Sequence, residues 1–131
     1  MQNTDPVWQH VDAKKEQFIE LSDKIWDNPE IAYDEYGAVA DHTEMLEREG
    51  FRVSRNVGGI PTAVMGEAGE EGPVIAILGE YDALPGLSQE NGVAEPRPLP
   101  GSGLGHGCGH NLLGSAAILA ATAVKDFLAE R

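Results

Sequence analysis

The apolar run Val-Ile-Ala-Ile-Leu at Val74–Leu78 constrains the fold more than any other feature of the sequence. A continuous apolar run of this length, unlike an alternating one, is typical of a strand that is buried on both faces. The segment Gly69–Gly72, with two glycines and two glutamates, predicts a turn just before it. Because such a strand needs helices on both sides, the sequence predicts a parallel or mixed sheet covered by helices.

The first helix is predicted over about Pro6 to Asp27. Asp5 can cap it, and proline suits the first helical position because the missing N–H has no partner there anyway. Asn28-Pro29 ends it. One face of this helix is apolar and carries Val7, Val11, Phe18, Leu21 and Ile25.

A second helix is predicted over about Tyr36 to Glu49, followed by Gly50 as the glycine that ends it. Short strands are predicted at Phe51–Ser54 and Thr62–Met65. The apolar stripe of the second helix consists of Val39, His42, Met45 and Leu46. The histidine on that stripe is interpreted as structural, because no Cys, Asp or His lies at ligand spacing from it.

The segment Pro85–Gly109 is rich in glycine and proline, without periodicity, and is long for a connection inside a compact domain. It is therefore predicted to be a functional loop. The last segment, Asn111–Leu128, is apolar nearly all round and predicts a buried helix. Two helices, short strands, a long loop and a buried helix together predict an α/β sandwich within one domain.

Nine basic residues face 22 acidic ones, which gives a formal net charge of −13 and argues against nucleic acid as a partner. The polar stretch Met1–Lys15 has no apolar core of signal-peptide length. No stretch is expected to approach the roughly 20 apolar residues of a membrane span. Cys108 is the single cysteine, so no internal disulfide is possible. These features predict a cytoplasmic protein that does not associate with membranes.

The stretch Gly101–Asn111 has glycine at every second position up to Gly109 and carries the most informative polar groups. Cys108 and His110 flank one glycine, and residues two apart in an extended segment point to the same side. A thiolate and an imidazole can then face one ion, and the positive end of the following helix favours the thiolate. Two ligands do not complete a zinc site, and a structural cysteine remains the alternative.

Asp82 follows the predicted central strand directly, in Gly79-Glu80-Tyr81-Asp82. Sites in α/β sheets lie beyond the carboxyl ends of strands, so this carboxylate can be a ligand, orient a ligand, or simply stabilise a turn. A nucleophilic Cys108 paired with His106 or His110 is a further alternative. Parallel side chains two residues apart are poorly placed for proton transfer between them.

Two motifs carry a family resemblance: Gly79-Glu-Tyr-Asp-Ala-Leu-Pro-Gly-Leu-Ser-Gln-Glu90 and Gly105-His-Gly-Cys-Gly-His-Asn-Leu-Leu-Gly114. They resemble the aminoacylase, hippurate hydrolase and auxin-conjugate hydrolase group of metallopeptidases, and Lys24–Glu30, Glu35 and Gly50-Phe51 also fit. The resemblance implies an α/β fold, part of the three-layer sandwich of a zinc-peptidase-like catalytic domain. Residues 1–131 would be its N-terminal part, without the remaining catalytic domain or the lid and dimerisation domain.

The resemblance also implies a two-metal amidohydrolase that uses manganese or zinc. The metal ligands of the family motif fall on Cys108 and His110, whereas His106 is expected outside the ligand set. Asp82 would support the metal site, and the general-base glutamate would not be in this chain. Many relatives have aspartate at the position of Asn111, which is interpreted as the mark of a subgroup.

The implied substrates are N-acyl amino acids such as aminobenzoyl-glutamate, and the full-length protein is expected to be a homo- or hetero-oligomer. The chain by itself is expected to be inactive, since it lacks the general base. The alternative is a short non-catalytic domain of the same fold that binds a metal or a partner.

Overall fold

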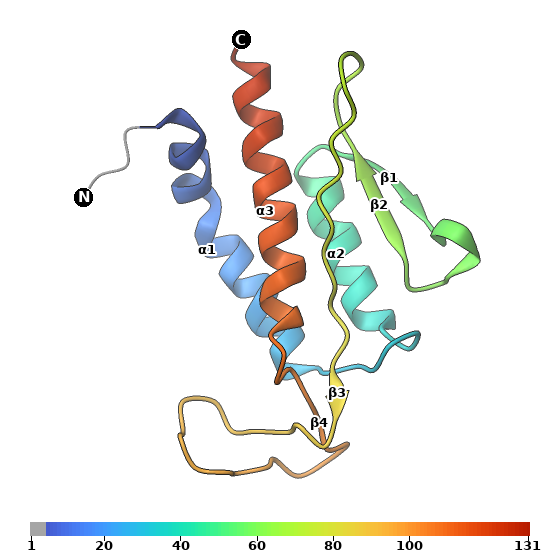
Figure 1. Ribbon diagram of the computed structural model, residues 1–131, viewed down its shortest axis with the longest axis vertical. Helices are drawn as coiled ribbons and strands as arrows, with labels where there is room; N and C mark the ends of the chain where they lie inside the picture. The colour runs from blue at the N-terminus through green and yellow to red at the C-terminus, as the bar shows by residue number, and fades with distance from the viewer. Residues whose placement is uncertain (1–4) are drawn as a thin grey trace.

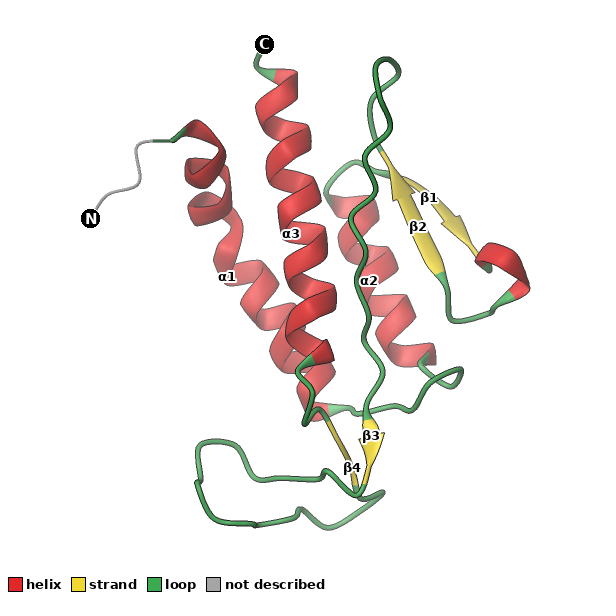
Figure 2. Ribbon diagram, viewed as in Figure 1, coloured by secondary structure: helices red, strands yellow, loops and turns green. Residues whose placement is uncertain are grey.

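The computed structural model describes residues 5–131, so the first four residues of the polar N-terminal stretch lie outside the described part. The described chain combines three helices with two small antiparallel sheets, which agrees with the predicted α/β class (Figures 1 and 2). The helices are α1 Pro6–Asp27, α2 Tyr36–Arg48 and α3 His110–Ala129. The strands are β1 Arg52–Arg55, β2 Val64–Glu67, β3 Leu84–Pro85 and β4 Leu104–Gly105, with a short 3-10 helix at Val57–Gly59.

The first two helices form where the sequence predicts them. Asp5 caps α1 by accepting a hydrogen bond from the Val7 N–H at 3.0 Å. The N-terminus of α2 is capped from a distance, because the Glu30 carboxylate accepts hydrogen bonds from the backbone N–H groups of Gly37 and Ala38. Beyond α2 the chain turns at Gly50, which has the positive φ of 82° that favours glycine.

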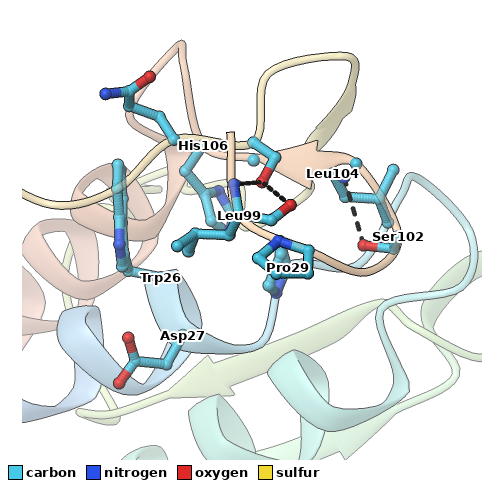
Figure 3. Close-up of a pocket in the computed structure, with 12 residues that line it drawn as sticks. Trp26, Asp27, Pro29, Leu99, Ser102, Leu104 and His106 are labelled. Carbon is cyan, nitrogen blue, oxygen red and sulfur yellow. Dashed lines mark hydrogen bonds between the residues drawn. The ribbon is translucent and has the colours of Figure 1, made fainter. Parts of the chain in front are cut away.

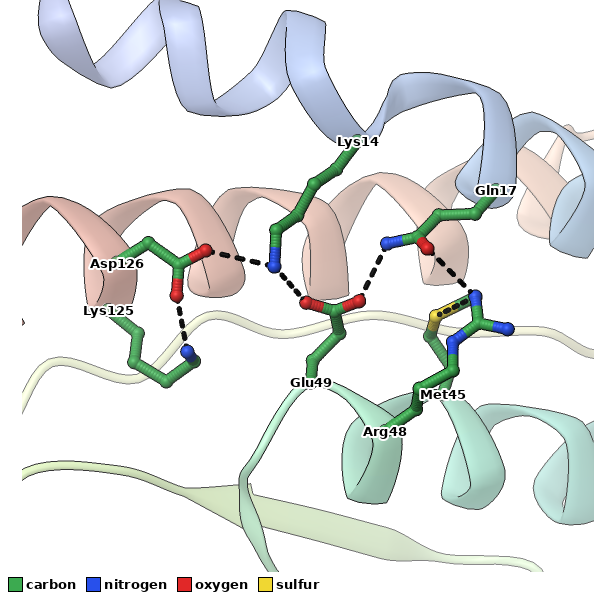
Figure 4. Close-up of polar contacts among 7 residues, drawn as sticks. All are labelled: Lys14, Gln17, Met45, Arg48, Glu49, Lys125 and Asp126. Carbon is green, nitrogen blue, oxygen red and sulfur yellow. Dashed lines mark hydrogen bonds and ion pairs between the residues drawn. The ribbon is translucent and has the colours of Figure 1, made fainter.

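The core lies where α1, α2 and α3 meet. Its buried members are Phe18, Leu21, Ile25, Ala38, Met45, Leu46 and Ile118. A polar network next to the core joins all three helices (Figure 4). Lys14 of α1 pairs with Glu49, just past α2, and with Asp126 of α3 at 2.9 Å.

The prediction that the last helix is buried all round is wrong for this structure. The face of α3 that packs on α1 is small and polar: Asn111 donates to Ser22 Oγ at 3.0 Å, and Ser115 donates to the Phe18 carbonyl. Ile118 is buried in the core, but other large apolar side chains of α3 are exposed, and Leu112 is 64% exposed. Only part of the apolar surface of α3 is therefore covered by the rest of the described chain.

The helix α3 is also long and apolar enough to cross a membrane, with a mean hydropathy of 1.6 over its most apolar window. The expectation that no stretch approaches a membrane span is therefore wrong by length and composition. The same two properties are typical of the core helix of a globular domain, so they do not by themselves place α3 in a membrane.

The predicted central strand Val74–Leu78 does not form within the described residues. The segment runs extended in front of α2, beside the β1–β2 hairpin in the view of Figure 1, but no strand pairs with it. An extended segment becomes a strand only when its N–H and C=O groups find a neighbour. The predicted strands at Phe51–Ser54 and Thr62–Met65 do form, shifted by one and two residues, and pair antiparallel as β1 and β2.

The long loop after Pro85 is confirmed, and its two ends are held together. β3 and β4 pair antiparallel, with Leu84 opposite Gly105. The segment before β3 is tied to the segment after α1 by an isolated parallel bridge between Ile31 and Ala83. As a result the end of the extended segment, the return of the loop and the start of α3 lie together at one end of the molecule (Figure 1).

Candidate metal centre

Three side chains from two distant segments meet at this end of the molecule. Glu80 and Asp82 come from the extended segment, where residues two apart point to the same side. His110 is the first residue of α3 and follows Gly109, whose φ of 80° turns the chain into the helix. The ligand atoms of the three residues all lie within 4.8 Å of one another, which is compact enough to hold a metal ion.

The imidazole of His110 lies between the two carboxylates. Its Nδ1 is 2.7 Å from Asp82 Oδ1, and its Nε2 is 3.0 Å from Glu80 Oε2. A neutral imidazole carries one N–H, so it can donate to only one of the two carboxylates. When Nδ1 donates to Asp82, the lone pair of Nε2 faces an oxygen lone pair of Glu80, which is repulsive unless a cation lies between them.

The separation of that second pair fits one metal ion. Zinc bonds to imidazole nitrogen and carboxylate oxygen at about 2.0–2.2 Å, which places two ligands of one ion about 3 Å apart or slightly more. The 3.0 Å between His110 Nε2 and Glu80 Oε2 meets this requirement. In this arrangement Asp82 fixes the tautomer and orientation of the ligand histidine through Nδ1, a common support of metal sites. A doubly protonated ring would also satisfy both carboxylates, without a metal.

Cys108 lies in an exposed turn close to this cluster in sequence, but it is not a member of it. The expectation that 108–110 is extended is wrong, because Gly109 N donates to the His106 carbonyl and the helix begins at His110. Among the described residues, no hydrogen bond joins Cys108 to either neighbouring histidine, so the geometry gives no support to a Cys–His nucleophile pair. The assignment of the thiolate as a metal ligand stays a prediction.

His106 faces away from the cluster, toward the end of α1. Its side chain is buried, its Nε2 donates to the Ile25 carbonyl at 3.2 Å, and burial lowers its pKa from the ordinary 6.5. It also lines a cavity of about 210 Å³ between the end of α1 and the long loop, beside Trp26 and Leu99 (Figure 3). The ring therefore supports the junction of loop and helix, and its place outside the ligand set stays a prediction.

Glu80 is the site residue that sequence reasoning misses. It lies within a recognisable motif, but the position just beyond the predicted strand draws attention to Asp82 alone. The same alternation that would place Cys108 and His110 on one side of an extended segment applies to Glu80 and Asp82. In the structure that rule fails for the first pair and holds for the second.

Comparison with known proteins places the chain beside amide- and peptide-bond hydrolases. A p-aminobenzoyl-glutamate hydrolase subunit of Escherichia coli strain K12 is 48% identical over 118 residues, which cover 90% of the chain and 24% of the relative. Xaa-Arg dipeptidase of Mus musculus is 33% identical over 130 residues, covering 92% of the chain and 26% of the relative. Thermostable carboxypeptidase 2 of Saccharolobus solfataricus is 34% identical over 108 residues, which cover 77% of the chain and 26% of the relative.

The chain thus spans about a quarter of the length of the curated relatives it matches. No family profile matches it.

Proposed function

Because the chain belongs to the family of amidohydrolases and peptidases that these relatives represent, we propose that it contributes part of the metal site of an amide-hydrolysing enzyme. The observation that carries the proposal is the His110 ring, with Asp82 at Nδ1 and Glu80 at Nε2. The proposed substrates are N-acyl amino acids, p-aminobenzoyl-glutamate among them, and the name of the Escherichia coli relative supports that choice.

Each residue of the cluster has a distinct task in this proposal. Glu80 and His110 hold a divalent ion, manganese or zinc, and Asp82 keeps the imidazole in the tautomer that leaves Nε2 free for it. Cys108 supplies a thiolate from the neighbouring turn. Bound metal ions, two in the complete enzyme, lower the pKa of water and polarise the scissile carbonyl. The general-base glutamate and the remaining ligands lie outside residues 1–131.

The rest of the proposed enzyme also completes the fold. Val74–Leu78 then becomes a central strand of a three-layer sandwich, since its side chains are apolar and its backbone has no strand partner among the described residues. A further polypeptide is proposed as a partner, in keeping with the Escherichia coli relative, which is named as a subunit. The cytoplasm is its proposed location.

The test measures metal content and turnover of p-aminobenzoyl-glutamate, hippurate and acetyl amino acids by the full-length protein, before and after chelation. His110→Ala and Cys108→Ser are expected to lose metal and activity together. Cys108→Asp is expected to keep more of both than Cys108→Ser, because a carboxylate is ionised at neutral pH and a hydroxyl is not. The matched control is His106→Ala, whose effect is expected to be milder.

Two outcomes would contradict the proposal. Full activity in the metal-stripped parent would exclude a metal-dependent reaction. A Cys108→Asp variant that is inactive yet retains all of its metal, in a protein insensitive to chelators, would favour a nucleophilic cysteine instead.

A further inference from the structure

His42 is the most deeply buried ionisable side chain at the site end of the core, and the proposed metal site does not use it directly. The imidazole is 2% exposed, and its Nδ1 lies 2.9 Å from the Ala38 carbonyl one helical turn earlier. A carbonyl only accepts, so Nδ1 carries the proton and Nε2 is the bare nitrogen. That Nε2 is buried and has no hydrogen-bond partner among the described residues. Core packing alone would be served better by an apolar side chain.

The ring of His42 supports the residue between the two carboxylates of the metal centre. The His42 and Tyr81 rings lie with centroids 4.6 Å apart and planes tilted by 45°. Tyr81 is fixed at its other end as well, because its hydroxyl donates to the Thr62 carbonyl. In an extended segment, Tyr81 points opposite to Glu80 and Asp82, so a contact on its ring sets how far these carboxylates reach toward α3.

The backbone of the same segment also rests directly on α3, at a glycine that lies against the His42 ring as well. A Cβ at Gly114 would lie 2.7 Å from the Glu80 carbonyl oxygen and 2.7 Å from His42 Nε2. Both distances are shorter than real contacts allow, and the first involves backbone that cannot swing aside. Gly114 is one helical turn beyond His110, so the two residues lie on the same face of α3. Gly114 admits the Glu80 backbone, and His110 presents its imidazole to the Glu80 and Asp82 carboxylates.

We infer that His42 and Gly114 are positioning residues that clamp the Glu80–Asp82 segment between α2 and α3 and so set both carboxylates against His110. The inference rests on the proposed function only where it concerns metal affinity. The clamp itself is a property of the metal-free chain. Neither residue touches the ion, and both act through the backbone and the ring of Tyr81.

The experiment uses the 131-residue chain with two variants, His42→Ala and Gly114→Ala. The second replaces a helical glycine by alanine, the best helix former, so the substitution favours α3 itself. Any change at the metal centre then comes from the added Cβ, which keeps the Glu80 backbone from approaching α3. Leu21→Ala is the matched control, since it removes a buried core side chain from α1 and leaves both clamp residues intact. Circular dichroism checks that all chains keep their helices.

Two signals are recorded, ¹⁵N NMR of the His110 imidazole without metal and calorimetric titration with Zn²⁺ alone. In the wild type and in Leu21→Ala, Nδ1 is expected to show as the protonated, hydrogen-bonded nitrogen. In both clamp variants that signal is expected to be lost or averaged, with Zn²⁺ affinity about tenfold lower, the size typical for loss of an outer support of a metal ligand.

The outcomes separate the two proposals. Wild-type imidazole signals in either clamp variant, or the same change in Leu21→Ala, would overturn the inference. If the wild-type chain binds no Zn²⁺, the proposed metal site is contradicted. If the Nδ1 signal of His110 is nevertheless lost in the two clamp variants and kept in Leu21→Ala, the clamp is still supported.

Discussion

One extended segment of this chain has two halves that behave differently. In Val74–Leu78 the side chains are apolar and largely uncovered, with Val74 98% and Leu78 85% exposed. In Gly79–Asp82 the chain is held from several sides: Gly79 lies against Ala117 of α3, Tyr81 packs on His42, and Asp82 bonds to His110. The next residue, Ala83, donates to the Glu30 carbonyl at 2.7 Å.

The difference shows what each half requires. The apolar half requires a strand neighbour and has none among the described residues. The polar half requires only α2, α3 and the segment after α1, all of which are present. A candidate metal centre can therefore take shape at the end of a strand that has not formed, because helices rather than sheet hydrogen bonds hold it.

The largest effect on stability is expected from Tyr81→Ala, compared with Leu78→Ala three residues earlier. Tyr81 packs against the core and its hydroxyl bonds to the Thr62 carbonyl, so its loss should lower the free energy of unfolding by about 2–4 kcal/mol. Leu78→Ala should change it by less than about 0.5 kcal/mol, because that side chain is exposed. Urea denaturation of both variants measures the contrast, and equal losses would abolish the distinction between the two halves.

A smaller effect is expected from Glu30→Ala. The carboxylate caps two N–H groups of α2, at 2.9 and 2.8 Å, while the backbone of the same residue holds Ala83. Loss of the cap should cost about 1 kcal/mol in urea denaturation. Glu30→Gln is the control, since its single carbonyl oxygen can still accept one of the two bonds and should cost less. If Glu30→Ala leaves the free energy of unfolding unchanged, α2 needs no cap from this segment.

Acid should weaken the helices that hold the polar half. Burial of Asp126 disfavours its charge, but hydrogen bonds from Lys125 and Lys14 outweigh this and hold the pKa of the carboxyl below the ordinary 3.8. A carboxyl with a lowered folded-state pKa stabilises the fold above its unfolded-state value, and that stability is lost as the pH falls below about 4.

The measurement is urea denaturation of the wild type and of Asp126→Asn at pH 7 and pH 3. The wild type should lose more stability on acidification than the variant, because the variant has no carboxyl to protonate at this position. Equal losses in the two proteins would show that the network around Lys14 does not contribute to the pH dependence.

The smallest effect on stability, and the clearest one on association, is expected from Ile75→Lys in the apolar half. Ile75 is 79% exposed, so the free energy of unfolding should change by less than about 0.5 kcal/mol. Self-association should fall, because a lysine on an unpaired extended segment opposes edge-to-edge pairing. Sedimentation velocity compares the two proteins, with exposed Glu71→Lys as the charge control. A wild type that is monomeric at high concentration would contradict the expectation.

Local patterns predict the helices well. Pro6 after Asp5, Asn28-Pro29 and Gly50 mark helix ends by chemistry that acts within a few residues, and α1 and α2 lie within one residue of their predicted bounds. The burial of α3 is predicted poorly. Its buried face includes Asn111, Gly114 and Ser115 beside Ile118, and the first three bond to or approach other segments, which hydropathy does not report.

The site can be predicted in part. The two motifs identify the right segments, and Asp82 and His110 do meet, 2.7 Å apart. Their meeting depends on the packing of Gly79 and Gly114 between segments far apart in sequence, which no local pattern reveals. Glu80 escapes prediction for the same reason, since its role becomes visible only once His110 lies opposite it.

Absorption spectroscopy of the chain with Co²⁺ tests the central claim most directly. Cobalt takes the same ligands as zinc, and its visible bands change when water is replaced by protein ligands, while a thiolate ligand adds a charge-transfer band. The account predicts protein-bound bands in the wild type, with a charge-transfer band from the thiolate. It predicts loss of the protein-bound bands in His110→Ala, Glu80→Gln and Cys108→Ser. A wild-type spectrum identical to that of aqueous Co²⁺, or one unchanged by His110→Ala, would contradict it.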